Sequence, residues 1–229
     1  MQNSRNLIRI LGIVAIIGAI LSTIAETCIF YLPGEGIEFN EYTLLQNVPQ
    51  SRLIIGHYLG VLSFPLQLLG FWQIYQALKP AGKWFSLSVF LLISYSWICG
   101  IAAYGSFAYM STALQTEIAA TEGDRTLLIQ MIDTLKIYHE PLYYVLLLGL
   151  VFSWVWYSVS VAFRSTLYPR WMAILNPFLM SIIVLFIGGK IPMISRFIGA
   201  AFYNIAIIIF FSISTIVLWN SQGKDLQVN

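Results

Sequence analysis

The sequence contains six apolar stretches, each long enough to cross the hydrocarbon core of a membrane as an α-helix. They cover residues 7–31, 53–78, 84–113, 141–163, 171–189 and 197–219. Within lipid, only an α-helix or a closed β-barrel satisfies every backbone hydrogen bond. Barrel strands alternate apolar and polar residues, and these stretches do not. The sequence therefore predicts an all-α fold, a polytopic transmembrane six-helix bundle that forms a single domain over residues 1–229.

The composition agrees with a chain that lipid covers. Hydrophobic residues make up 59% of the sequence and charged residues only 10%, and the mean hydropathy is +0.78. Soluble domains contain roughly 25% charged residues, so this chain has too little polar surface to face water on all sides. The net charge is only +2, which argues against nucleic acid as a partner. The expected partner is the lipid bilayer, and a homo-oligomer is compatible with the sequence.

The positions of lysine and arginine indicate an orientation, because these residues concentrate in cytoplasmic loops. With the N-terminus inside, seven basic residues lie on the inner side and five on the outer side. The inner set is Arg5, Arg9, Lys79, Lys83, Arg164, Arg170 and Lys224, and the outer set is Arg52, Arg125, Lys136, Lys190 and Arg196. We therefore expect both termini in the cytoplasm.

Two outer loops contain apolar residues at helical spacing. Residues 41–48 are expected to form a short amphipathic helix with Asn40 as its N-cap. Residues 124–138 are expected to form a second one, because Thr121 and Asp124 resemble a capping box at its start. Two interpretations remain open for this second segment. It lies as a lid on the outer surface, or it extends the fourth spanning helix outward.

Polar and ionisable residues gather at one depth. A charged group within a spanning helix is costly and is a functional candidate by default. Counting about 1.5 Å of rise per residue places all the candidates in the outer third of the membrane. The candidate ligand-binding residues are Glu26, His57, Tyr58, Tyr104, His139, Glu140, Tyr143, Lys190 and Asn204.

Three interpretations of these residues remain open. In the first, they line an outward-facing polar pocket that binds or senses a small amphiphile or lipid, with the acid pairing a cationic head. In the second, Glu26, His57, His139 and Glu140 hold a metal, or Glu26 or His57 is the general base of an enzyme acting on a lipid. In the third, Glu26 pairs with His57 or Lys190 to hold together an accessory or structural subunit. The sequence identifies no cofactor.

Asn176 and Pro177 fall inside the fifth stretch, residues 171–189. Proline removes a helix hydrogen bond, so the pair predicts a kink within this spanning helix.

The last two stretches resemble a family of uncharacterised bacterial six-span membrane proteins. The residues that carry the resemblance are Tyr168-Pro169-Arg170-Trp171-Met172, Asn176-Pro177, Gly188-Gly189-Lys190, Pro192, Tyr203-Asn204 and Phe210-Phe211, with Gly56-His57 earlier in the chain. The resemblance implies an all-helical fold in a bacterial inner membrane and no particular activity. It also implies that Asn176, Lys190 and Asn204 belong to the family pattern.

Overall fold

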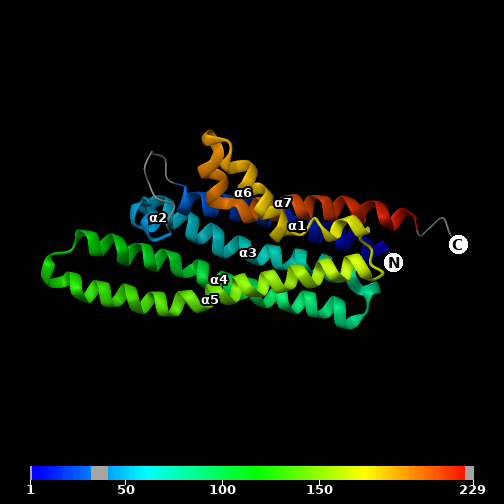
Figure 1. Cartoon of the computed structure of the whole chain (residues 1–229), viewed down its shortest axis with the longest axis horizontal. Coiled ribbons are helices and arrows are strands. Elements are labelled where there is room, and N and C mark those ends of the chain that lie inside the picture. Colours follow the sequence, from blue (N-terminus) through cyan, green and yellow to red (C-terminus); the bar gives the residue numbers. More distant parts are fainter. Residues whose placement is uncertain (1, 32–40, 225–229) are drawn as a thin grey trace.

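The computed structural model describes residues 2–31 and 41–224, which form helices joined by short connections (Figure 1). The described residues contain no β-strand, so the all-α prediction is confirmed. In chain order the helices are α1 (Gln2–Phe30), α2 (Glu41–Asn47), α3 (Gln50–Leu78), η1 (Lys79–Ala81), α4 (Lys83–Ala119), α5 (Glu122–Phe163), η2 (Arg170–Ala173), α6 (Pro177–Gly189) and α7 (Pro192–Lys224). Among the described residues, five helices are long and apolar enough to cross a membrane: α1, α3, α4, α5 and α7.

Helices α4 and α5 form a hairpin that extends past the neighbouring helices (Figure 1). They contain 37 and 42 residues, or about 56 and 63 Å at 1.5 Å per residue, against a hydrocarbon core of about 30 Å. Residues 124–138 belong to α5, so the extension is correct and the separate lid helix is wrong. The reason is packing: Ile132 is buried and Leu135 packs against the core.

The short helix expected at residues 41–48 is present as α2, and its expected cap Asn40 lies outside the described residues. The capping box at the start of α5 is only partly formed. Thr121 is the N-cap residue, but its hydroxyl donates to Asp124 Oδ2 at 3.1 Å and does not accept a backbone N–H.

The fifth apolar stretch is not one helix, which corrects the prediction for residues 171–189. Residues Arg170–Ala173 form a 3₁₀ turn, and α6 begins only at Pro177. Asn176 is extended (φ −82°, ψ 148°), and its Oδ1 accepts the backbone N–H of Leu179 at 2.9 Å. The Asn-Pro pair therefore starts a helix and does not kink one. With 13 residues, α6 is about 20 Å long, shorter than the hydrocarbon core.

Helices α6 and α7 are antiparallel where they meet, and α7 bends at Ala201, whose backbone is non-helical (φ −137°, ψ 21°). The part of α7 before Ala201 forms a hairpin with α6 that leans away from the bundle (Figure 1). The part after Ala201 packs along α1, which also packs against α3. Contacts between α6 and α5 are few, which leaves space between this hairpin and the bundle.

Candidate functional site

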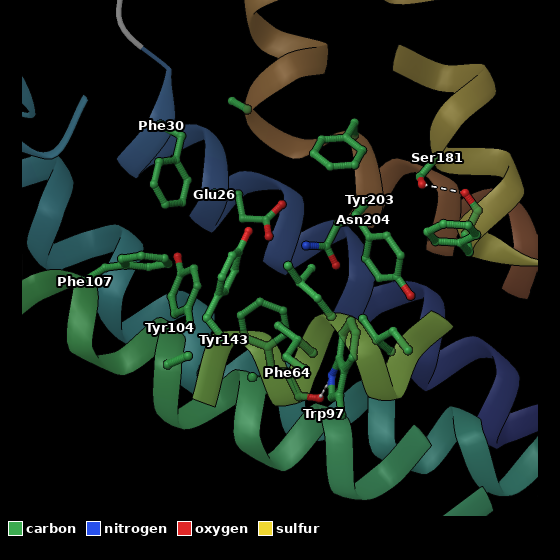
Figure 2. Close-up of a pocket in the computed structure, with 18 of the residues that line it drawn as sticks. Glu26, Phe30, Phe64, Trp97, Tyr104, Phe107, Tyr143, Ser181, Tyr203 and Asn204 are labelled. Carbon is green, nitrogen blue, oxygen red and sulfur yellow. Dashed lines mark hydrogen bonds between the residues drawn. The ribbon is translucent and has the colours of Figure 1, made fainter. Parts of the chain in front are cut away.

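A cavity of about 600 Å³ lies between the α6–α7 hairpin and the rest of the bundle (Figure 2). This volume is within the range of small-molecule binding sites, about 300–1,000 Å³. Helices α1 to α7 all contribute to its wall, and most of the contributing residues are apolar. The residues that present aromatic or polar groups to it are Glu26, Phe30, Phe64, Trp97, Tyr104, Phe107, Tyr143, Phe178, Ser181, Phe202, Tyr203 and Asn204.

Small residues make the space. Gly100 and Ala103 of α4 line the cavity beside Tyr104, and Gly199 and Ala200 of α7 line it just before the bend of that helix. Gly100 allows a close approach between α4 and α5, since a Cβ built there would lie 2.8 Å from Leu146 Cδ1. The bend at Ala201 turns the first part of α7 away from the bundle (Figure 1). The wall is mainly apolar, which corrects the expectation of a polar pocket: its polar groups are confined to one region.

Glu26 is the centre of this polar region. It lies on α1, one turn before Phe30, and it is the only formally charged residue among the described residues that line the cavity. The ion pairs of the described chain are Arg125–Glu117 at 2.6 Å and Lys136–Asp133 at 3.2 Å, and both lie on the α4–α5 hairpin. Among the described residues Glu26 therefore has no ion pair, which does not support its predicted pairing with His57 or Lys190.

Asn204 of α7 is the polar neighbour of Glu26. Its side chain is buried, with 1% exposed, and its amide nitrogen is directed towards the Glu26 carboxyl (Figure 2). Apart from Glu26, this Nδ2 has no hydrogen-bond partner among the described residues. The amide oxygen faces the other way and accepts from Gln67 Nε2 at 3.0 Å. Gln67 thus determines which end of the Asn204 amide faces the cavity.

The Gln67 side chain is itself held within the bundle. Its Nε2 also donates to Ser22 Oγ at 2.8 Å, and Ser22 Oγ is 2.8 Å from Ser63 Oγ. These hydrogen bonds join α1, α3 and α7 behind the cavity. Gln67, Ser22 and Ser63 were not among the residues predicted for the site, although a glutamine within an apolar stretch is a recognisable signal of interhelical hydrogen bonding.

Aromatic rings cover one side of Glu26. Phe30, Tyr104 and Tyr143 surround this part of the cavity (Figure 2). The Tyr104 hydroxyl donates to the carbonyl of Gly56 at 3.0 Å, which fixes the ring across α3. Phe107 supports the group from behind, with ring centroids 5.1 Å from Phe30 and 5.8 Å from Tyr104. The faces and hydroxyls of these rings are therefore oriented by packing before any ligand arrives.

The two histidines lie outside the cavity wall. His139 is buried behind Tyr143, with ring centroids 5.7 Å apart, and its Nδ1 is 2.7 Å from Ser106 Oγ. His57 contacts the ring of Tyr58, which is 63% exposed, at 5.1 Å between centroids. The His57 Nδ1 is buried without a hydrogen-bond partner.

Two charged candidates also lie elsewhere. Glu140 is exposed and accepts a hydrogen bond from the Tyr42 hydroxyl at 3.3 Å. Lys190 is exposed and lies 4.3 Å from the ring centroid of Phe186. Of the nine candidates, the structure brings together Glu26, Tyr104, Tyr143 and Asn204 around the cavity. In the described part of the chain, no three His, Cys, Asp or Glu side chains are grouped to hold a metal.

The sequence profile of a family of unknown function, DUF6796, matches residues 1–221. The chain belongs to this family. No curated protein and no solved structure matches it. Neither the family nor the comparisons supply an activity.

Proposed function

We propose that this protein binds or senses a small amphiphile or lipid in the cavity beneath the α6–α7 hairpin. The observation that carries the proposal is the division of the wall into a large apolar part and one polar region at Glu26 and Asn204. An amphiphile has the same division. Its chain contacts the apolar residues of α4, α5 and α7, and its head group lies beside Glu26.

The sparse packing between α5 and α6 supports entry from the side. In a membrane, a gap between two helices opens towards lipid, so an apolar molecule reaches the cavity without crossing water. Phe178 of α6 and Leu147 of α5 both line the cavity, one from each helix beside the gap.

The orientation we propose has six crossings, with both termini in the cytoplasm of a bacterial cell. The fifth of these crossings combines α6 with the irregular segment before it, residues 170–176. In support, α1 starts and α7 ends at the same end of the bundle (Figure 1). The connections at residues 79–83 and 164–170, which contain four of the basic residues of the inner set, meet there, since Leu167 N–H donates to the carbonyl of Ala77 at 2.9 Å. Glu26 then lies towards the outer leaflet.

A pair of substitutions on α4 tests the proposed function. Ala103 lines the cavity and is 1% exposed, while its neighbour Ala102 is exposed on the outer face of the helix. Ala103→Leu therefore fills the cavity, and Ala102→Leu adds the same atoms outside it. Unfolding midpoints are measured on purified protein with a panel of twelve-carbon amphiphiles.

A ligand at about 100 times its Kd stabilises a protein by about 2.7 kcal/mol. We expect at least one amphiphile to raise the unfolding midpoint by an amount that corresponds to this stabilisation, both in the natural protein and in Ala102→Leu. In Ala103→Leu the same amphiphile should raise the midpoint by less. The proposal fails if no amphiphile raises the midpoint, or if Ala103→Leu responds as fully as the control. Release of a chemically altered lipid would instead favour an enzyme.

A further inference from the structure

We infer that the amphiphile carries a cationic ammonium head group and that Glu26 is its counter-ion; this inference rests on the proposed function. The first observation is the charge distribution of the wall. Glu26 is the only formally charged residue among the described lining residues, and no lysine, arginine or histidine is among them. A carboxylate in a membrane-embedded, mostly apolar site is stabilised by a cation, and the described chain provides none.

The second observation is the state of Asn204. Its Nδ2 is buried, is directed towards Glu26 and has no other hydrogen-bond partner among the described residues, while Gln67 holds the opposite end of the amide. An amide N–H directed at a carboxyl orients it as an acceptor. A carboxylate has about four lone-pair positions, so one neighbouring amide leaves acceptor capacity for a ligand.

The third observation is the aromatic group beside the carboxyl. Phe30, Tyr104 and Tyr143 lie on the same side of the cavity as Glu26 (Figure 2). Aromatic faces attract cations within about 6 Å of the ring centroid, and aromatic cages are a recurrent way to bind quaternary ammonium groups. A carboxylate next to several rings recognises a large, weakly hydrated cation better than it recognises a neutral or anionic head.

The same features argue against an anionic ligand. A fatty acid would bring a second carboxylate beside Glu26, and like charges at short range repel. A phosphocholine lipid has the required ammonium, but it also brings a phosphate for which the described wall has no basic partner. The cavity therefore favours a molecule with a single positive charge and one apolar chain.

The test compares probes that share a twelve-carbon chain and differ in the head. Full-length protein in nanodiscs of neutral lipid is titrated with dodecyltrimethylammonium, dodecanoate and 1-dodecanol. The two ionic probes are kept below their micelle concentrations and 1-dodecanol below its solubility limit. Lysophosphatidylcholine is a fourth probe, which separates a phospholipid source from a free alkylammonium. Glu26→Gln removes the charge with little change of shape. Glu140→Gln is the control, because Glu140 is an exposed carboxylate away from the cavity.

We expect dodecyltrimethylammonium to bind at least tenfold more tightly than dodecanoate or 1-dodecanol. Glu26→Gln should lose at least tenfold in ammonium affinity and keep its affinity for 1-dodecanol, whereas Glu140→Gln should change neither. Lysophosphatidylcholine should bind more weakly than the simple ammonium; equal or tighter binding would overturn the single-charge conclusion and identify the ligand as a zwitterionic lipid.

Two further results distinguish the failures. If 1-dodecanol and dodecanoate bind as tightly as the ammonium, the head-group inference is wrong and the proposed function stands. If no probe binds, both are wrong. Should Glu26→Gln fail to fold, Tyr143→Phe and Tyr143→Leu replace it. The phenylalanine keeps an aromatic face and should keep ammonium binding, and the leucine should weaken it without changing 1-dodecanol binding; equal effects on both probes would overturn the inference.

Discussion

Substituting Gly60 with alanine should destabilise the protein through one contact with Tyr104. A Cβ atom built at Gly60 would lie 2.1 Å from Tyr104 Cε1 and 2.5 Å from Cζ. Carbon atoms pack at about 3.5–4.0 Å, so the ring would have to move by about 1.4 Å or more. The ring is 5% exposed and its hydroxyl donates to Gly56, which leaves it little room to move.

Three terms set the expected magnitude of Gly60→Ala. Overpacking a core costs typically about 1–3 kcal/mol. A displaced interhelical hydrogen bond within a membrane bundle costs about 0.6 kcal/mol, and about 1.7 at most. The change from glycine to alanine returns about 0.4–1 kcal/mol, because alanine restricts the unfolded chain. The net loss is centred near 2 kcal/mol, which lowers the unfolding midpoint by about 4–8 °C for a chain of this size.

The assay is thermal unfolding in a neutral detergent, with Gly105→Ala as the matched control. A Cβ at Gly105 meets only Val61 Cγ2, at 3.9 Å, so this variant should be as stable as the natural protein or slightly more stable. Because Tyr104 lines the cavity, Gly60→Ala should also weaken binding of the ammonium probe, while Gly105→Ala should not.

A double-mutant cycle isolates the contact. In a Tyr104→Ala background the ring is absent, so adding Gly60→Ala should cost nothing or be favourable, with a coupling energy of at least about 1 kcal/mol. The predicted clash with Tyr104 is wrong if Gly60→Ala lowers the unfolding free energy equally in both backgrounds. It is also wrong if Gly60→Ala is as stable as Gly105→Ala.

Three other substitutions follow from single contacts. Gln67→Leu should lower the unfolding free energy by about 1–3 kcal/mol and also weaken ligand binding, because Asn204 loses the donor that orients it; unchanged affinity would contradict this. Asn176→Ala should cost about 1 kcal/mol through the lost cap of α6, and a further amount because Nδ2 no longer donates to Ser158 Oγ. Asn176→Ser, which can still cap the helix, should restore the capping part only, both read from hydrogen exchange in α6. Arg52→Gln should increase exchange in the last turn of α1, because its guanidinium donates to the carbonyl of Tyr31; exchange confined to α3 would contradict that reason.

The helices were predictable from apolar length, and the one clear error has a local cause. Residues 171–175 are as apolar as a spanning helix, so length alone extended the fifth helix back to Trp171. A residue before proline avoids the α conformation, however, and an asparagine followed by proline is a start signal for a helix. Asn176 is accordingly extended and caps α6. A prediction that gave the Asn-Pro pair more weight than the length of the apolar stretch would start this helix at Pro177, as the structure does.

Counting residues along each stretch predicts a depth for each candidate residue, but it does not predict the helix face on which the residue lies. Glu26 and His57 are both about one turn from the outer ends of their stretches, so counting residues placed them together. In a soluble protein, the positions of polar residues show which face of a helix meets water, so the buried and exposed faces can be told apart from the sequence. In a membrane both the lipid-facing and the buried faces are apolar, so the sequence contains little information on rotation. The structure places Glu26 in the cavity wall and His57 outside it.

The cavity depends on how α6 is attached. At its base, Asn176 Nδ2 donates to Ser158 Oγ at 2.9 Å, and Ser158 Oγ donates to the Ala173 carbonyl at 2.6 Å, which ties α6 to α5. Beyond this point the contacts between α6 and α5 are few, and α6 is instead packed against α7, where a Cβ at Gly188 would lie 2.5 Å from Ile198. Helix α6 is thus anchored to α5 at its start and packed against α7 near its end. Because α6 is short and is attached to both α5 and α7, it leaves open a gap beside α5. A helix of full spanning length in its place, packed along α5, would close that gap.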